Sequence, residues 1–175
     1  FYYGFDALET FLFVPGHESH GTHIKDGIDL KRTMFTVVIA MIPALLFGMW
    51  NVGHQHFLAI GEFTAMADGF MDKFMYGAIK VLPVVVVAYG VGLGIEFVIA
   101  IIQKHPVNEG FLVSGMLIPL IMPPTIPLWM VALATAFAVI LGKEAFGGTG
   151  MNILNVALIA RVFIFFAYPT YMSGD

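Results

Sequence analysis

The chain has 175 residues, of which 59% are hydrophobic and only 11% are charged. An ordinary soluble domain is about 45–50% apolar and about 25% charged. Because the excess apolar residues come in long uncharged runs, the composition indicates an all-helical membrane protein with several spans. The charges lie in the loops, and no basic stripe predicts nucleic-acid binding. The absence of cysteine excludes disulfides and any iron–sulfur cluster held by this chain alone.

Residues 1–32 predict a cytoplasmic or interfacial segment, and residues 33–175 predict the membrane domain. His17, His20 and His23 recur every three residues, as metal ligands on a tight helix would. Two nearby glycines oppose a regular helix, so we expect a solvated loop and no metal site. The chain does not begin with Met, and we expect it to be a fragment of a longer protein with both ends missing.

Apolar runs of helical length predict about five membrane spans, since a span needs about 20 residues. The predicted spans are residues 33–52, 77–102, 108–122, 125–141 and 152–168. Basic residues at their ends predict a chain that starts in the cytoplasm and ends outside. The third span is short and interrupted by prolines, which predicts a half-helix or a bent helix that lines a cavity.

Two charged side chains lie inside predicted spans, where an unpaired charge is costly. Glu96 is the only charged residue between Val81 and Gln103. Two interpretations stay open for it, an interhelical hydrogen bond and a place on an ion pathway. Arg161 lies in the middle of the last span. It needs a partner, which could be Glu96 in a salt bridge, a group of backbone carbonyls, or a ligand phosphate or carbonyl.

Glycines and asparagines mark two further candidate sites. Gly90, Gly92 and Gly94 form a run that lets either a neighbouring helix or a flat ligand approach the backbone. Asn152 and Asn155 follow a glycine loop, and their spacing predicts that they share one face of the last helix. Amides both donate and accept, so they can bind the edge of an isoalloxazine or the carbonyls of a quinone. The alternative is helix capping, for which Asn152 is better placed than Asn155.

The glycines near these asparagines complete neither a phosphate-binding loop nor a dinucleotide fingerprint. The residues alone therefore fit a transporter or channel as well as a redox subunit. Four segments, however, resemble the B-type subunit of the Na⁺-translocating NADH:quinone oxidoreductase family. They are residues 23–32, 104–111, 123–129 and 142–175. A weaker resemblance is to the D-type subunit of the Rnf complex, which shares the Gly-Gly-Thr-Gly and asparagine region.

The resemblance implies a multi-subunit respiratory complex in the bacterial inner membrane. Such a complex passes electrons from NADH through flavins and iron centres to quinone and moves Na⁺ outward. The whole subunit would bind riboflavin, covalent FMN and quinone, in two inverted halves similar to the urea and ammonium channels. This chain would be the first half, and the threonine that attaches FMN is expected beyond Asp175. The competing functions are an Rnf-type ferredoxin:NAD oxidoreductase subunit and a passive urea or ammonium channel.

The resemblance also assigns individual residues. Asn152 and Asn155 match paired asparagines of the family and are the predicted flavin contacts, and Gly150 and Arg161 are further predicted cofactor contacts. Gly92 matches a glycine near the quinone site, and Glu96 matches an intramembrane acid linked to Na⁺ uptake. The chain departs from its relatives at Leu93, where a second glycine can stand, and at Val156, where proline is frequent. No catalytic side chain is expected, because the cofactors carry the redox chemistry.

Overall fold

The computed structural model describes residues 30–62, 65–66, 68–103, 110–148 and 151–172. Within these residues the chain is helical. The α-helices are α2 (Leu30–Ile60), α3 (Phe70–Gln103), α4 (Phe111–Ile121), α5 (Leu128–Gly142) and α6 (Val156–Ala167), and two short 3-10 turns are η1 (Glu144–Phe146) and η2 (Pro169–Tyr171). The predicted histidine loop lies outside the described residues. The prediction of an all-helical membrane protein is confirmed.

The helices differ in whether they are long enough to cross a bilayer. Among the described residues, three stretches are sufficiently long and apolar, namely Thr33–Ile60, Phe70–Ile102 and Leu128–Phe146. The apolar helices α4 and α6 have only 11 and 12 residues. At about 1.5 Å per residue, each is shorter than a hydrocarbon core of about 30 Å. Five complete spans and an inverted-repeat partner half therefore stay predictions.

Helix α2 continues to Ile60, well beyond the predicted end of the first span, and α3 begins at Phe70. Both helices pass through an internal proline, Pro43 in α2 and Pro83 in α3. Proline ends a helix in water more often than in a membrane, where neighbouring helices and local adjustments can satisfy the freed carbonyl. The pair Pro123–Pro124, by contrast, follows the end of α4, and the chain at Met122 is extended.

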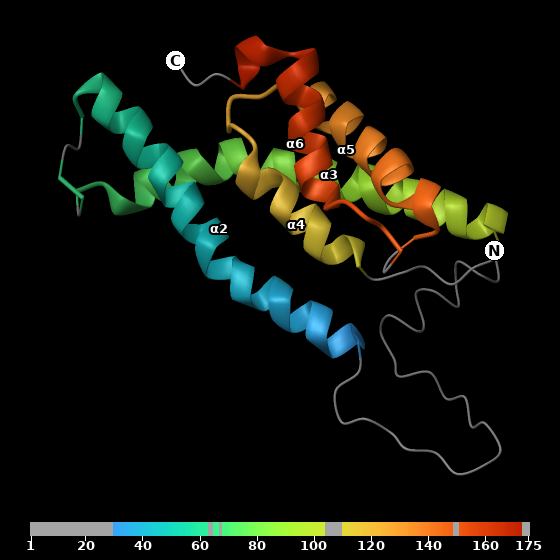
Figure 1. Cartoon of the computed structure of the whole chain (residues 1–175). Helices are drawn as coiled ribbons and strands as arrows, with labels where there is room; N and C mark the ends of the chain where they lie inside the picture. The colour runs from blue at the N-terminus through green and yellow to red at the C-terminus, as the bar shows by residue number, and fades with distance from the viewer. Residues whose placement is uncertain (1–29, 63–64, 67, 104–109, 149–150, 173–175) are drawn as a thin grey trace.

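Helix α3 is the central element of the fold. It contacts α2, α4 and α5, whereas α6 packs on α4 and α5. Figure 1 shows α3 running behind the other helices, with α2 crossing near its beginning and the first half of α2 standing away from the rest. The end of α3 and the turn between α5 and α6 lie on the same side of the molecule (Figure 1). This arrangement brings Glu96 of α3 close to the chain that precedes α6.

Glycine sets the closest helix contact. A Cβ at Gly53 of α2 would overlap the Lys73 carbonyl, and a Cβ at Gly77 of α3 would overlap the Met49 carbonyl. Small residues of this kind let helix backbones approach in lipid, where water provides no hydrophobic driving force between helices. Gly48, next to Met49 in the chain, would have nothing within 4 Å of an added Cβ. Gly53 and Gly77 are therefore the positions at which the two backbones come closest, and Gly48 lies away from the contact.

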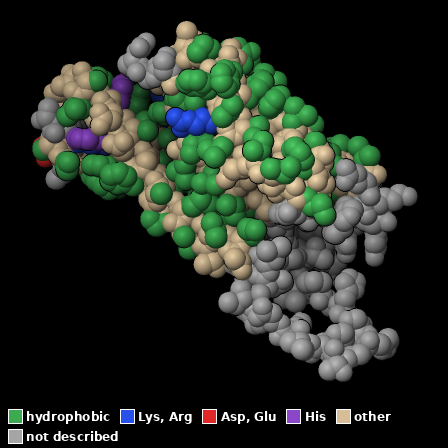
Figure 2. Space-filling view, viewed as in Figure 1, with side chains coloured by type: hydrophobic (Ala, Val, Ile, Leu, Met, Phe, Trp, Pro, Cys, Tyr) green, Lys and Arg blue, Asp and Glu red, His purple; other side chains and the backbone are tan. Residues whose placement is uncertain are grey.

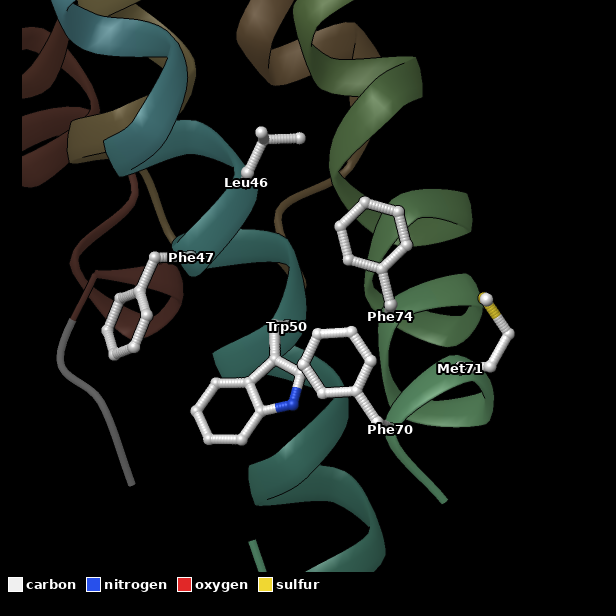
Figure 3. Close-up of a pocket in the computed structure, with 6 residues that line it drawn as sticks. All are labelled: Leu46, Phe47, Trp50, Phe70, Met71 and Phe74. Carbon is white, nitrogen blue, oxygen red and sulfur yellow. The ribbon is translucent and has the colours of Figure 1, made fainter. Parts of the chain in front are cut away.

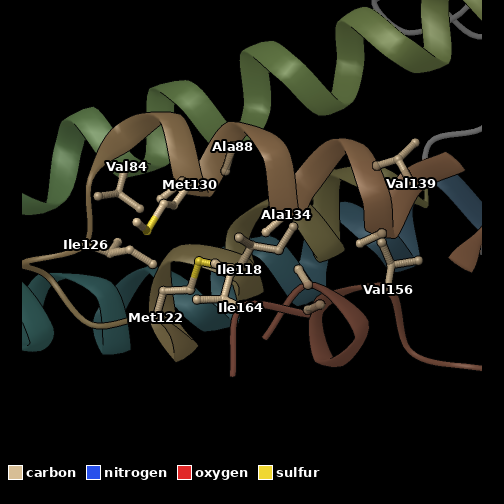
Figure 4. Close-up of a cluster of buried hydrophobic side chains, with 14 of the residues drawn as sticks. Val84, Ala88, Ile118, Met122, Ile126, Met130, Ala134, Val139, Val156 and Ile164 are labelled. Carbon is tan, nitrogen blue, oxygen red and sulfur yellow. The ribbon is translucent and has the colours of Figure 1, made fainter. Parts of the chain in front are cut away.

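The main core lies where α3, α4, α5 and α6 meet, and small side chains form its centre. Ala88, Ala134, Ala138 and Ala160 are fully buried. Larger apolar side chains surround them, including Val84, Ile118, Met122, Met130, Val139, Val156 and Ile164 (Figure 4). Close packing of this kind fixes the relative positions of α3, α5 and α6, and so of the polar groups they carry.

The visible surface is largely apolar (Figure 2). Exposed large side chains include Phe35 and Phe47 on α2, Val86 on α3, and Phe165 and Phe166 on α6. Continuous apolar surfaces on soluble monomers are rare, so this surface fits contact with lipid or with further protein. A small blue patch of Lys or Arg atoms is visible in Figure 2, surrounded by this apolar surface.

Candidate functional site

The turn between α5 and α6 is organised around the backbone of Lys143. Its N–H donates to the Val139 carbonyl at 3.2 Å and closes α5. Its carbonyl accepts from Phe146 N at 3.2 Å and from Gly148 N at 3.1 Å. Gly147 and Gly148 have φ angles of 101° and 95°, a left-handed conformation that favours glycine. The glycines predicted to form a loop thus reverse the chain here.

Asn155 is the N-cap of α6. Its Oδ1 accepts from Ala157 N at 3.0 Å and from Leu158 N at 3.3 Å. Asn152 lies before the helix, where its Nδ2 donates to the Leu154 carbonyl at 3.1 Å. The expectation that both asparagines share a helix face is therefore wrong, and the capping role belongs to Asn155 instead of Asn152. Gly150, the third predicted contact of this loop, lies outside the described residues.

An open groove of about 660 Å³ begins at Asn155 and follows α5 and α6. Its lining consists of Phe137, Leu154, Asn155, Leu158, Ile159, Val162, Phe163, Phe166 and Ala167. The rings of Phe137 and Phe163 are stacked, with centroids 4.4 Å apart. Asn155 is the one polar side chain of this lining. Because capping occupies its Oδ1, the Nδ2 group is the part of the amide that can donate to a ligand.

Glu96 forms an ion pair with Lys143 inside the protein. The Lys143 ammonium donates to Glu96 Oε1, and both side chains are 3% exposed. The second carboxylate oxygen, Oε2, is buried and has no hydrogen-bond partner among the described residues. Lys143 follows the predicted span 125–141 as one of the basic residues at span ends, and the sequence did not predict this contact. The two residues are 47 positions apart, so no spacing rule could join them.

Arg161 contacts the C-terminal end of α4. Its Nη1 donates to the carbonyl of Ile121, which is the last residue of that helix. The carbonyls at the end of a helix lack intrahelical partners, and the following Pro123–Pro124 pair has no N–H groups to supply them. Of the predicted partners, a backbone carbonyl is the one found, and Glu96 is not the partner of Arg161. The rest of the Arg161 side chain is exposed.

We expect Arg161→Met to destabilise the protein, because the terminal carbonyl of α4 then loses its charged donor. A hydrogen bond to a charged group contributes about 1.5–3 kcal/mol. Arg161→Lys keeps a charged donor and should lose less. Thermal unfolding of the purified protein measures the difference, with Phe165→Met as a control on the same helix, at a side chain that is 53% exposed. Equal midpoints for Arg161→Met and this control would contradict the assignment.

Gly92 lies against the ring of Phe111, the first residue of α4. A Cβ at Gly92 would overlap that ring, and the Phe111 side chain is fully buried. Gly90 and Gly94 have nothing within 4 Å of a Cβ position and are exposed. Helix packing is thus the observed environment of Gly92. Tyr89 strengthens the same contact, since its hydroxyl donates to the Leu112 carbonyl at 2.6 Å.

A second groove, of about 630 Å³, lies between α2 and α3 (Figure 3). It is lined by Leu46, Phe47, Trp50, Phe70, Met71 and Phe74. Trp50 stacks on His54 with ring centroids 5.1 Å apart. The Trp50 Nε1 and His54 Nδ1 atoms are buried without hydrogen-bond partners in the described chain. The spacing of Trp50 and His54 by four residues was a sequence signal for this stack.

Comparison with known proteins relates the sequence of this chain to one family. A sequence model of the NQR2, RnfD, RnfE family matches residues 17–174. The chain is 48% identical to the B-type subunit of the Na⁺-translocating NADH-quinone reductase of Stutzerimonas stutzeri, over 98% of this chain and 47% of that protein. The proteins of the same name from Ectopseudomonas mendocina and Chromohalobacter salexigens are 46% and 42% identical, over 98% and 100% of this chain and 47% of each protein.

The chain spans about half the length of the curated relatives it matches. The family match, in contrast, covers most of the chain, from residue 17 to residue 174. It includes the Glu96–Lys143 pair, the α5–α6 turn and the groove at Asn155. The chain therefore belongs to the NQR2, RnfD, RnfE family.

Proposed function

We propose that this chain is part of the membrane subunit of a redox-driven sodium pump. In this function electrons pass from NADH through flavins to quinone, and Na⁺ is exported. The observation that carries the proposal is the identity of 42–48% with B-type subunits of Na⁺-translocating NADH-quinone reductases, along nearly the whole chain. The groove at Asn155 and the buried Glu96 provide matching places for a flavin and for a cation pathway.

The groove at Asn155 fits the flat ring system of a flavin. Its volume of about 660 Å³ lies within the usual range for small-molecule sites, about 300–1,000 Å³. Such sites combine mostly apolar walls with a few polar groups that fix orientation. Phe137 and Phe163 offer apolar faces for the rings, and Asn155 Nδ2 offers a donor for a ring carbonyl. We assign riboflavin to this groove.

When bound, riboflavin supplies the electron-carrying chemistry. The contribution of the chain is to bind and orient it. The Asn155 amide is fixed in position because Oδ1 caps α6, so Nδ2 can donate without first losing rotational freedom. Asn152, Gly150 and Arg161 are further candidate contacts from the sequence. The threonine that would attach FMN is expected beyond Asp175, and no FMN site is assigned to the described residues.

Glu96 is the proposed cation-pathway residue. Its carboxylate offers oxygen ligands, which suit hard cations, and it is the only charged residue of α3 between Val81 and Gln103. Gly92, one turn away on α3, is the residue that the sequence assigns to quinone. Redox coupling requires that the affinity for Na⁺ differ between redox states, because a ligand without differential affinity shifts no equilibrium. The proposed setting is a multi-subunit complex in the bacterial inner membrane.

An Rnf-type subunit of a ferredoxin:NAD oxidoreductase is the second candidate, since the matched family includes RnfD and RnfE. Purifying the intact complex separates the alternatives. We expect a flavin absorption spectrum and NADH-dependent quinone reduction that NaCl, compared with choline chloride, accelerates. Ferredoxin oxidation in place of quinone reduction would support the Rnf alternative, and a colourless complex would support a passive channel.

Replacement of Glu96 tests the cation role. We expect Glu96→Gln to abolish most of the acceleration by NaCl while flavin content stays near that of the unmodified complex, because the amide has lost the charge that attracts a cation. The measurement is quinone reduction across a range of NaCl concentrations, with extractable flavin determined on the same samples. Unchanged Na⁺ stimulation in the Glu96→Gln complex would exclude Glu96 from the pathway.

A further inference from the structure

The Glu96–Lys143 pair joins the proposed cation site directly to the α5–α6 turn. Both side chains are almost completely buried, at 3% exposure, so neither water nor salt screens the contact much. In such a place an uncompensated charge is costly, so the ionised form of Glu96 is stabilised by a cation close to it. In the described structure that cation is the Lys143 ammonium, which occupies Oε1.

The other side of the carboxylate is available. Glu96 Oε2 is buried and has no hydrogen-bond partner among the described residues. An ionised carboxylate accepts about four hydrogen bonds or metal contacts, so one contact leaves most of its capacity unused. A small cation that reaches Oε2 would lie within a few ångströms of the ammonium on Oε1. Two positive charges at this distance repel strongly in a medium of low dielectric constant.

Lys143 can leave Glu96 without breaking a helix. It is the C-terminal cap of α5, and its side chain is a flexible four-carbon stem. The next residue, Glu144, is a second carboxylate that can balance the released ammonium. The backbone carbonyl of Lys143, however, accepts hydrogen bonds from both Phe146 N and Gly148 N. One residue therefore contacts Glu96 through its side chain and holds the turn through its backbone. The turn then runs directly to Asn152 and Asn155.

We propose that Lys143 is a built-in competitor for cations at Glu96, and that its release links cation arrival to the position of the α5–α6 turn. The inference rests on the proposed function, because it assumes that Na⁺ reaches Glu96. Cation binding and the Lys143 contact exclude each other at one carboxylate. The apparent affinity for Na⁺ is then lowered by the fraction of time that Lys143 occupies the site.

Two substitutions at Lys143 change this competition in opposite directions. Lys143→Met keeps an unbranched side chain, one atom shorter, and removes the charge. If Lys143 occupies Glu96 for about nine-tenths of the time, its removal lowers the half-saturating Na⁺ concentration about tenfold. Lys143→Arg keeps the positive charge and introduces a planar guanidinium group, which can donate hydrogen bonds to both carboxylate oxygens. We expect this stronger competitor to raise the half-saturating Na⁺ concentration severalfold.

The experiment measures quinone reduction by the purified complex across NaCl concentrations at constant ionic strength, with choline chloride as the balancing salt. A second measurement, without turnover, is the change in flavin absorbance on NaCl addition, which reports whether cation binding reaches the groove at Asn155. In the unmodified complex we expect a Na⁺-dependent change in this spectrum. Lys143→Met should abolish this change or reduce it at least severalfold. If Lys143 only stabilised the fold, its replacement by Met would not lower the half-saturating Na⁺ concentration while its replacement by Arg raised it.

The outcomes separate the inference from the function on which it rests. If the unmodified complex shows no Na⁺-dependent turnover, the proposed function fails. If the unmodified complex and Glu96→Gln differ in Na⁺ dependence but both Lys143 variants titrate like the unmodified complex, the competitor role alone is wrong. Should Lys143→Met fail to assemble, Lys143→Arg decides, because an unchanged or lowered half-saturating Na⁺ concentration in that variant overturns the proposal.

Discussion

Asn155→Ala should remove most of the non-covalent flavin from the complex and slow quinone reduction at least about tenfold. The substitution deletes two functions of one amide. The N-cap of α6 is lost, which costs about 0.5–2 kcal/mol, and so is the proposed donor to a ring carbonyl, which contributes about 0.5–1.5 kcal/mol. A loss of about 1.4 kcal/mol in binding is a tenfold loss of affinity. Flavin extracted by acid from the purified complex is the direct measurement.

Two further variants separate capping from flavin binding. Asn155→Asp and Asn155→Ser keep an oxygen that can accept from Ala157 N and Leu158 N, and both residues are good N-caps. Neither retains an amide donor. If Nδ2 binds the flavin, both variants should keep the thermal stability of the complex and still lose extractable flavin. Flavin retained in both, together with loss in Asn155→Ala alone, would show that Asn155 matters only as a cap.

The position of Asn155 shows where sequence reasoning reaches its limit. The residue types predicted a capped helix after a glycine loop, and both features are present. The helix start was predicted one turn too early, at Asn152, because asparagine is a good cap residue at both position 152 and position 155. In the structure α6 begins at Val156, with Asn155 as its N-cap.

Contacts between distant segments were less predictable than the helices themselves. Apolar runs identify each helix because a span must satisfy its own backbone hydrogen bonds. The cost of a buried charge also predicted that Glu96 and Arg161 would have partners. Which partners they have depends on how the helices are arranged. α3 and α5 pack together, so Glu96 meets Lys143, whereas α6 packs on α4, so Arg161 meets the Ile121 carbonyl.

The run of three glycines does not show whether Gly92 packs against a neighbouring helix or forms the wall of a quinone site. In the structure a Cβ at Gly92 would overlap the Phe111 ring, which is fully buried. Overpacking of this kind typically costs about 1–3 kcal/mol, and more when the neighbour cannot adjust. If Gly92 formed the wall of a quinone site, an added side chain would instead collide with the bound quinone. Phe111 is the residue that distinguishes the two roles.

We therefore expect Gly92→Ala to lower the thermal stability of the complex by about 1–3 kcal/mol, with Gly94→Ala close to the unmodified protein. Gly94 is the matched control, because it lies on the same helix with nothing within 4 Å of a Cβ position. Adding Phe111→Leu to Gly92→Ala makes room for the new methyl group and should restore part of the stability and of the quinone reduction rate. A double variant that regains stability but keeps a raised KM for quinone would place the quinone, and not only Phe111, against Gly92.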